Sequence, residues 1–273
     1  MTRWLALGAV LSVLLWPDPS RAGSLKLDGR LTQGALVIGT TEPDTGVQLD
    51  GRVVRVSPEG RFLLGFGRDA PPQMILDLVF PDGTRARRTL EIAARQYDIR
   101  RIDGLPPDKV SPPPEVLERI QREAALVAEV RKVDRPQALF ESGFVWPVTG
   151  EITGIFGSQR VLNGEPRRPH FGVDIAATEG TPVTAPADGV VVLAHPEMYF
   201  SGGTVIIDHG HGLSSAYLHM KEVWVREGDR LGQGDPIGTV GATGRVTGAH
   251  LDWRFNWFEE RLDPMLIAGP MPE

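Results

Sequence analysis

The sequence predicts a mainly β protein that contains one helical segment. Gly and Pro are abundant, at 32 and 23 of the 273 residues, and this composition favours strands and turns over a helical bundle. Short apolar or alternating runs alternate with Asp-Gly dipeptides, which favour tight turns. Helical periodicity is confined to residues 106–135. We expect an N-terminal β-sandwich, a linker helix and a strongly bent antiparallel β-sheet in the C-terminal half.

The first 22 residues are typical of an export signal. Arg3 is followed by an apolar run from Trp4 to Trp16, shorter than the ~20 residues that span a bilayer. Ser20-Arg21-Ala22 fits a small-x-small cleavage site. We expect a signal peptide over residues 1–22, cleaved after Ala22, with an uncleaved membrane anchor as the alternative. The mature chain is expected to lack a transmembrane span and to work in the periplasm or cell envelope.

Residues 23–105 predict a small β-sandwich. The runs "GALVIGT", "RFLLGFG" and "MILDLVF" are apolar or alternating, as strands that bury one or both faces are. Asp50-Gly51 separates "VQL" from "RVVRV", which is a hairpin pattern. This region contains no histidine, and its carboxylates lie mostly in turns. We therefore expect a binding or packing domain rather than a catalytic one.

Residues 106–135 predict a linker with an amphipathic helix. Glu115 and Arg119, and likewise Glu118 and Arg122, are spaced to pair on the outer face of the helix. The helix is expected to lie on the surface and dock on one domain. A coiled-coil dimer is the less favoured alternative, because the run spans only about three heptads. The apolar face consists of Leu117, Ile120, Ala124, Val127 and Val130.

Composition limits the chemistry available. The chain has no cysteine, which excludes disulfides, Cys-ligated zinc and a cysteine nucleophile, so a metal would be held by His, Asp or Glu. A net charge of −6 without a basic tract argues against nucleic acid as a partner. All six histidines lie between His170 and His250. We therefore expect the functional site within residues 136–273.

The stretch "TGAHLDWRF" predicts a strand with an unusual polar face. Side chains in a strand alternate between its faces, so His250, Asp252 and Arg254 share one face while the apolar side chains between them face the core. A buried row of an imidazole, a carboxylate and a guanidinium must be paired, solvated or bound to a metal.

Two further groups carry the same residue types. "RPHFGVD" places His170 four residues before Asp174, with Gly172 between them. "SAYLHM" places Tyr217 and His219 two apart, so that the pair is expected on one strand face. Each group alone is weak evidence, but together with the strand that starts at His250 they predict a metal site if the fold brings them together.

The three motifs resemble those of the lysostaphin-type (LytM-like) zinc metallopeptidases, which cut peptidoglycan peptides. The family pattern is His-x-x-x-Asp, then Tyr-x-His, then His-x-His, and the similarity extends over about residues 145–265, including "VREGDRLGQGDPIGTVG". It implies the bent antiparallel β-sheet of that peptidase family for residues 136–273. The chain departs from the pattern at Asp252, where the family has His, and at Arg254, where it usually has Glu.

The resemblance implies a role for each motif residue. His170 and Asp174 would bind one Zn²⁺ per chain, with Asp252 as the third ligand. His219 and His250 would be catalytic residues that orient the attacking water and stabilise the transition state. Asp is an accepted zinc ligand, and three protein ligands leave a position open for water.

The sequence leaves rival functions open. We favour an exported zinc metalloendopeptidase that hydrolyses amide bonds in peptidoglycan peptides, with Tyr217 in the wall of its site. If Asp252 only pairs with Arg254, the metal is lost, and the domain is an inactive regulator of a partner cell-wall hydrolase or a peptidoglycan binder. A structural envelope protein is a third candidate. A cell-envelope protein could bind the sandwich or the helix.

The remaining histidines have simpler explanations. His195 precedes Pro196 and is expected in a loop. His209 and His211 are expected in a turn that does not contact the metal. A second metal site formed by these two and Asp208 is a much less favoured alternative.

Overall fold

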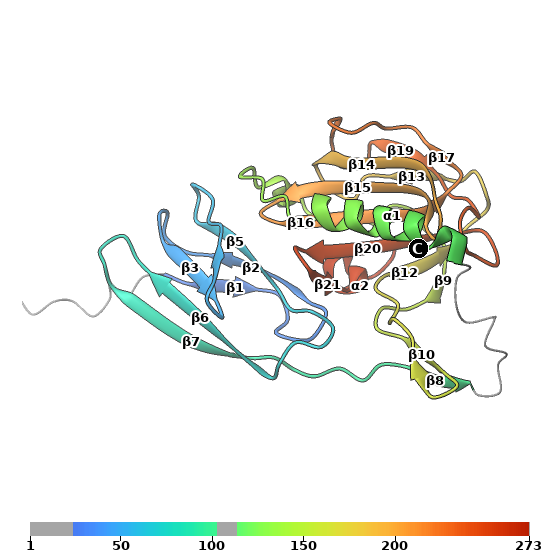
Figure 1. Cartoon of the computed structure of the whole chain (residues 1–273). Helices are drawn as coiled ribbons and strands as arrows, with labels where there is room; N and C mark the ends of the chain where they lie inside the picture. The colour runs from blue at the N-terminus through green and yellow to red at the C-terminus, as the bar shows by residue number, and fades with distance from the viewer. Residues whose placement is uncertain (1–23, 103–113, 273) are drawn as a thin grey trace, which may run out of the picture.

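The computed structural model describes residues 24–102 and 114–272 (Figure 1). The predicted signal peptide and the cleavage site after Ala22 lie outside the described residues. Within those residues the chain is mainly β, which confirms the predicted fold class. None of the helices in the described ranges is long and apolar enough to cross a membrane.

The N-terminal part of the chain forms two small antiparallel sheets, ordered β1-β2-β5 and β4-β3-β6-β7. Asp50 and Gly51 have φ values of +46° and +80° and join β3 to β4, which confirms the predicted hairpin. Apolar side chains of both sheets belong to one core cluster. The strands are β1 (Lys26–Asp28), β2 (Leu36–Thr40), β3 (Gly46–Leu49), β4 (Arg52–Val54), β5 (Arg61–Gly65), β6 (Gln73–Val79) and β7 (Arg85–Glu91).

A strand from the end of the N-terminal region joins the C-terminal half. β8 (Ile99–Ile102) pairs in parallel with β10 (Gln159–Leu162), and β11 (Glu165–Pro166) adds to β10 in the antiparallel sense. The chain therefore reaches the C-terminal half before it enters the linker helix (Figure 1).

The C-terminal half is built on an antiparallel sheet, which in the described residues has eight strands in the order β18-β14-β15-β16-β20-β12-β9, with β21 on β20. All residues of β15 and β16 are buried. A smaller sheet has the order β13-β19-β17. The strands are β9 (Glu151–Gly154), β12 (Val173–Ala176), β13 (Pro182–Thr184), β14 (Gly189–Met198), β15 (Gly202–Gly210), β16 (Leu213–Met220), β17 (Glu222–Val223), β18 (Arg230–Leu231), β19 (Pro236–Thr239), β20 (His250–Trp257) and β21 (Glu260–Leu262).

His195 does not lie in a loop, so this expectation was wrong. It lies in β14, opposite Thr204 of β15. β14 continues through Pro196 because the register shifts between His195 and Met198, and a proline is tolerated where the ladder is interrupted.

The linker helix α1 (Leu117–Val130) docks on the C-terminal sheet. Val127 and Val130 pack on an apolar patch that includes Leu193, Ile206 and Leu218, and α1 lies over β16 and β20 in Figure 1. This contact confirms the prediction that the helix docks on one domain. Val127 and Val130 belong to the predicted face, whereas Leu117 of that face is 42% exposed. No residue of α1 is itself buried, so the contact with the sheet is shallow. A short helix, α2 (Pro264–Ala268), follows β21.

One of the two predicted ion pairs forms on α1. Arg122 lies 2.5 Å from Glu118, as predicted. Arg119 instead pairs with Glu123, at 2.7 Å. Glu115 lies in a 3₁₀ turn, Pro114–Val116, that precedes α1, and its tighter winding removes the i,i+4 alignment with Arg119.

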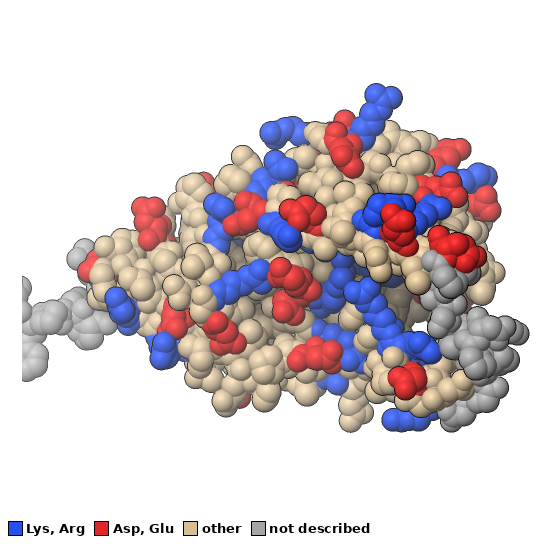
Figure 2. Space-filling view, viewed as in Figure 1, with Lys and Arg blue, Asp and Glu red and all other residues tan. Residues whose placement is uncertain are grey.

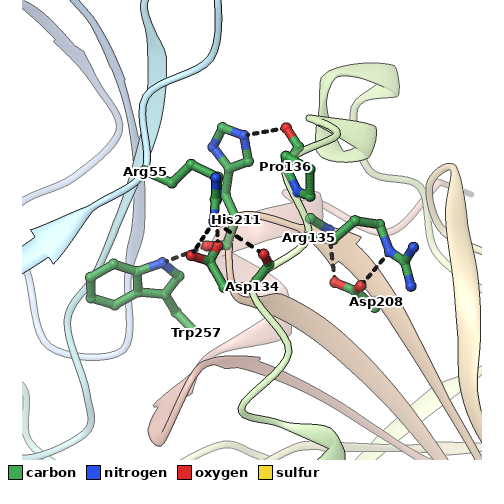
Figure 3. Close-up of polar contacts among 8 residues, drawn as sticks. Arg55, Asp134, Arg135, Pro136, Asp208, His211 and Trp257 are labelled. Atoms are coloured by element: carbon green, nitrogen blue, oxygen red, sulfur yellow. Dashed lines mark hydrogen bonds and ion pairs between the residues drawn. The ribbon is translucent and has the colours of Figure 1, made fainter. Parts of the chain in front are cut away.

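The segment after α1 is fixed to both halves of the molecule by ion pairs (Figure 3). Arg55, which follows β4, donates from Nε and Nη2 to the two carboxylate oxygens of Asp134, each at 2.8 Å. Arg135 donates from Nε to Asp208 of β15 at 2.7 Å. Adjacent residues of this segment therefore bind the N-terminal and the C-terminal sheets.

Trp257, the last residue of β20, packs against the N-terminal sheets. Its side chain is only 2% exposed, and its indole N–H donates to the His211 carbonyl at 3.1 Å. The Arg52 guanidinium lies 5.2 Å from the centre of the Trp257 ring. A Cβ on Gly65 of β5 would lie 2.7 Å from the Trp257 side chain. The two halves thus share one packed interface.

Candidate metal centre

The register of β12 and β20 brings the predicted ligands together. Asp174 lies opposite Asp252, and Ala176 lies opposite His250, so these side chains share one face of the sheet. Leu251, Trp253 and Phe255 point into the core. The predicted alternation of polar and apolar faces along β20 is therefore confirmed.

His170, Asp174 and Asp252 each offer a ligand atom, and these atoms all lie within 4.8 Å of one another. His170 Nε2 lies 3.2 Å from Asp174 Oδ1. Both atoms are shielded from solvent, and neither makes a hydrogen bond to another described residue. Buried polar atoms are normally paired, so two that face each other without a bond fit a cation held between them. A nitrogen and two carboxylates are ligands that zinc accepts, so these residues fit the ion.

Glycines make room for the two carboxylates. A Cβ on Gly172 would lie 2.5 Å from Asp252 Oδ1, and a Cβ on Gly154 would lie 2.2 Å from Asp174 Oδ2. Distances below about 3.0 Å are not tolerated between such atoms, so larger residues at either position would push a ligand out of place. Gly172 therefore serves the spacing of the His170–Asp174 motif.

Asp252 is held by Arg254. Arg254 Nε donates to Asp252 Oδ1 at 2.8 Å, and Nη2 donates to Oδ2. Burial opposes ionisation of Asp252, whose side chain is 4% exposed, but the charge and hydrogen bonds of Arg254 outweigh burial and lower the pKa of Asp252. Asp252 is thus a fixed carboxylate. Because each carboxylate oxygen has about two lone-pair sites, each keeps one beyond its bond to Arg254.

His219 and His250 lie side by side, with ring centres 4.9 Å apart. Nδ1 of His219 lies 2.9 Å from the Thr243 carbonyl, and Nδ1 of His250 lies 2.9 Å from the Gly248 carbonyl. A carbonyl only accepts hydrogen bonds, so each Nδ1 carries a proton, and the neutral form of each ring has Nε2 as its acceptor. Burial lowers the pKa of His219, which favours the neutral ring. His250 Nε2 lies 3.9 Å from Asp174 Oδ1 and so faces the ligands.

Tyr217 and His219 do not share a strand face, so this prediction was wrong. Tyr217 is fully buried in the core, where its hydroxyl lies 2.8 Å from Ser215 Oγ, and it does not form the wall of the site. The cause is a bulge in β16: Tyr217 opposes Val205 and Met220 opposes Gly203, so three steps on β16 match two on β15.

His209 has a structural environment. Its Nδ1 lies 2.7 Å from the Asp188 carbonyl, and its Nε2 lies 2.8 Å from Ser215 Oγ. Across the described residues, the one cluster that could hold a metal is His170, Asp174 and Asp252.

Sequence reasoning missed the arginines around this site. Arg131, Arg168 and Arg261 line the same hollow as Arg254, although they lie in three separate segments. Their arrangement has no local sequence signal, because it depends on how α1 docks and how β20 pairs with β21. The carbonyls that hold His219 and His250 were missed because every residue has a backbone carbonyl, so such contacts cannot be predicted from residue type.

Comparison with known proteins agrees with the geometry. Residues 168–264 match the model of Peptidase family M23. The peptidoglycan DD-endopeptidase ShyA of Vibrio cholerae is 41% identical over 100 residues, which are 33% of this chain and 23% of ShyA. The DD-carboxypeptidase/endopeptidase Mpg of Neisseria meningitidis serogroup B is 40% identical over 106 residues, 39% of this chain and 24% of Mpg. The chain therefore aligns with about a quarter of the length of these relatives.

A solved structure extends the similarity beyond the matched domain. A crystal structure described as a peptidase M23 of Pseudomonas aeruginosa is 26% identical, with a TM-score of 0.70, and the match covers 88% of this chain and 96% of that one. Coverage of this extent reaches beyond residues 168–264 into the N-terminal sheets. The C-terminal half of this chain is a Peptidase family M23 domain.

Proposed function

We propose that the protein is an exported zinc metalloendopeptidase that hydrolyses amide bonds in the peptide part of peptidoglycan. The observation that carries the proposal is the pair of unbonded, inward-facing atoms His170 Nε2 and Asp174 Oδ1 beside the ionised Asp252. The names of the relatives ShyA and Mpg, a peptidoglycan DD-endopeptidase and a DD-carboxypeptidase/endopeptidase, support the substrate class.

His170, Asp174 and Asp252 would hold the zinc. When bound, the ion would supply a Lewis acid and a water that ionises near neutral pH. The Nε2 atoms of His219 and His250, which are not needed for the bonds to the backbone carbonyls, are suited to accept the proton of the attacking water and to pass a proton to the departing amine nitrogen. A protonated imidazole next to the substrate would also stabilise the oxyanion of the tetrahedral state.

Arg254 would act as a positioning residue for Asp252. Its two hydrogen bonds fix the carboxylate while leaving lone pairs for a metal. Two carboxylate ligands balance the charge of Zn²⁺, and the guanidinium restores one positive charge next to the centre. Pairing with Arg254 and binding of metal are therefore compatible in this geometry.

The proposed location is the periplasm or cell envelope. It rests on the export signal expected over residues 1–22 and on a substrate found outside the cytoplasm. We also propose that the N-terminal sheets, which contain no histidine, contact a cell-envelope protein rather than the substrate bond.

Zinc content and hydrolysis, measured on the same preparations, test the proposal. Wild type dialysed against metal-free buffer should retain about one zinc per chain, whereas His170→Ala and Asp252→Ala should lose it. His219→Ala should keep the zinc but cleave peptidoglycan peptides about 10²–10⁴-fold more slowly. Asp77→Ala, which alters an acidic residue on β6 of the N-terminal sheet, is the matched control and should change neither value.

A second candidate function is favoured by the Asp252–Arg254 contact itself. If that ion pair replaces the metal, the domain is an inactive regulator of a partner cell-wall hydrolase or a peptidoglycan binder. Equal, near-zero zinc in wild type and in Asp252→Ala would favour this candidate and reject the peptidase.

A further inference from the structure

An arginine-lined hollow lies beside the metal centre. A cavity of about 440 Å³ opens between α1 and the sheet, and its lining includes Arg131, Arg168, Arg254 and Arg261. Arg131 is the C-cap residue of α1, and Arg261 lies on β21. Figure 2 shows basic side chains gathered along the hollow that lies below α1 of Figure 1. Segments far apart in sequence thus direct positive charge to one place.

This charge is not neutralised by the surrounding residues. Arg254 pairs with Asp252, but Arg131, Arg168 and Arg261 make no ion pair with any residue in the described ranges. Arg131 Nε is shielded from solvent and has no hydrogen-bond partner among those residues. Three guanidinium groups therefore line the hollow without a counter-charge.

The acidic residues of the lining are already engaged. Glu123 binds Arg119 at 2.7 Å and accepts a hydrogen bond from the Tyr199 amide at 2.8 Å. Glu259 pairs with Arg52 at 3.0 Å. Neither carboxylate is thus available to balance the arginines.

Close packing of like charges is unfavourable, and it contributes to lowered pKa values of two arginines in the hollow. Burial, together with the charges of Arg261, Arg254 and Arg168, lowers the pKa of Arg131 to about 8. Burial and two arginine neighbours also lower the pKa of Arg261, to about 10. An arrangement of this kind is stabilised by a bound anion, and guanidinium groups bind carboxylates in a two-pronged geometry.

The hollow lies close to the proposed metal ligands. Arg168 precedes His170 by two residues, and Arg254 follows Asp252 by two residues. The Arg254 guanidinium itself bonds Asp252 at 2.8 Å and also lines the hollow, so the hollow adjoins the proposed ligands. An anion held here would therefore lie close to a bond at the metal.

The other end of the hollow is apolar. Val127 of α1 and Ile206, Ala216 and Leu218 of the sheet line it. A ligand that fits both ends has a small apolar side chain and a carboxylate, as a short acidic peptide does.

We propose that this hollow is a subsite that binds a free carboxylate of an acidic peptide through Arg131, Arg168 and Arg261. That the anion belongs to a peptide rests on the proposed function, whereas the anion site itself rests on the arginines alone. The subsite selects substrates that carry a free carboxylate close to the bond that is cut.

Binding to zinc-free, full-length protein tests the subsite without any hydrolysis. After chelation, acetyl-D-alanyl-D-alanine and its C-terminal amide are titrated by calorimetry at low salt. The acid should bind at least about tenfold more tightly than the amide, because a charge-assisted hydrogen bond is lost with the carboxylate. Equal affinity for the acid and the amide would overturn the proposal.

Variants assign the binding to the arginines. Arg131→Gln and Arg261→Gln should each weaken binding of the acid by about tenfold, while binding of the amide stays unchanged. Arg122→Gln is the matched control, because Arg122 lies on α1 with a side chain that is 64% exposed and outside the lining. If Arg131→Gln and Arg261→Gln both bind the acid as tightly as wild type and Arg122→Gln do, the assignment is wrong.

Thermal unfolding separates a peptide site from a general anion site and does not require the peptide to bind. Sulfate, compared with chloride at equal ionic strength, should raise the Tm of wild type more than that of Arg131→Gln or Arg261→Gln. A sulfate effect combined with no preference for the acid over the amide would reject the peptide ligand. Absence of both effects would reject the anion site.

The two proposals fail in different ways. Preference for the acid in a protein that holds no zinc and cleaves nothing would leave the subsite standing and reject the peptidase. Zinc binding and hydrolysis without a preference for the acid would do the reverse.

Discussion

The backbone conformation of His219 determines where its imidazole lies in the site. Its φ of +67° is left-handed, which is uncommon for a residue with a side chain. It lies in the bulge of β16, between Tyr217 in the core and Met220 opposite Gly203. The bulge turns the imidazole away from the core and towards His250. Strained backbone of this kind persists where the surrounding structure fixes it, and it is common at functional sites.

His209 should make stability depend on pH. Burial lowers its pKa from 6.5 to about 4, against the opposing effect of the Asp188 carbonyl. The unfolded chain takes up a proton below pH 6.5, while the folded chain does so only near pH 4. The stabilisation is therefore complete above pH 6.5 and is lost as the pH falls to 4. At about 1.36 kcal/mol per pH unit, it amounts to about 3 kcal/mol.

Urea unfolding of wild type and His209→Gln at several pH values checks this prediction. Between pH 7 and pH 4.5 the wild type should lose more free energy of unfolding than the variant, by an amount approaching 3 kcal/mol. His195→Gln, at a partly exposed position, is the control. Parallel curves for wild type and His209→Gln would contradict the assignment.

The alternation along β20 could be read from the sequence because the strand period is local and its core face is strongly apolar. The same rule failed at Tyr217 and His219, because a bulge depends on the partner strand. Convergence of His170 with Asp252 followed from the family resemblance and not from spacing, since the two residues lie in different strands or loops. The arginine cluster was missed for the same reason: Arg131 and Arg261 meet only in the folded chain.

At the scale of elements, α1 and the strands beneath it differ in how firmly they are held. None of the α1 residues is buried. Its contacts with the sheet region include Val127 and Val130, the hydrogen bond from the Tyr199 amide to Glu123, and one from Arg119 to the Glu197 carbonyl. In contrast, every residue of β15 and β16 is buried. Few buried contacts imply a low free energy of local opening.

Hydrogen exchange should therefore separate α1 from the sheet. Amide protons of α1 are expected to exchange through local opening at a much lower free energy than those of β15 and β16, which should exchange only near global unfolding. Mass spectrometry of peptides from the three elements, in native buffer, makes the comparison. Protection of α1 equal to that of β16 would show that the helix is an integral part of the fold.

Periodicity predicted α1 and the part of its docking face that holds Val127 and Val130, because the apolar side of a helix repeats at a fixed spacing in the sequence. The partner of β8 could not be predicted this way. Parallel pairing with β10 joins segments about 60 residues apart, and nothing local in either strand specifies the other.

At the scale of the whole molecule, the N-terminal sheets and the M23 domain share packing. Trp257 of β20 is buried against Gly65 and Arg52. Ion pairs reinforce this contact: Arg52 with Glu259 at 3.0 Å, and Arg95 with Asp263 at 2.8 Å. The C-terminal sheet therefore depends on the N-terminal region for part of its core.

Trp257→Ala should destabilise the whole chain. Loss of a buried large aromatic side chain typically lowers the free energy of unfolding by about 3–5 kcal/mol. Trp224→Ala, where the side chain is 50% exposed, should change it by about 0.5 kcal/mol or less. Chemical unfolding monitored by circular dichroism measures both. Similar effects of the two substitutions would contradict a shared core.

The pairing of β8 with β10 has a consequence for how such proteins evolve by recombination. A gene fusion that joined a new N-terminal region near residue 105 would inherit α1 but discard β8, leaving an edge of β10 bare. A fusion point between β7 and β8, before Ile99, keeps that strand. Even with that fusion point, the new N-terminal region would need a surface that covers Trp257 and a cationic side chain that pairs with Asp134. The two regions are therefore expected to be inherited together, in keeping with a similarity to the Pseudomonas aeruginosa protein that covers 88% of this chain.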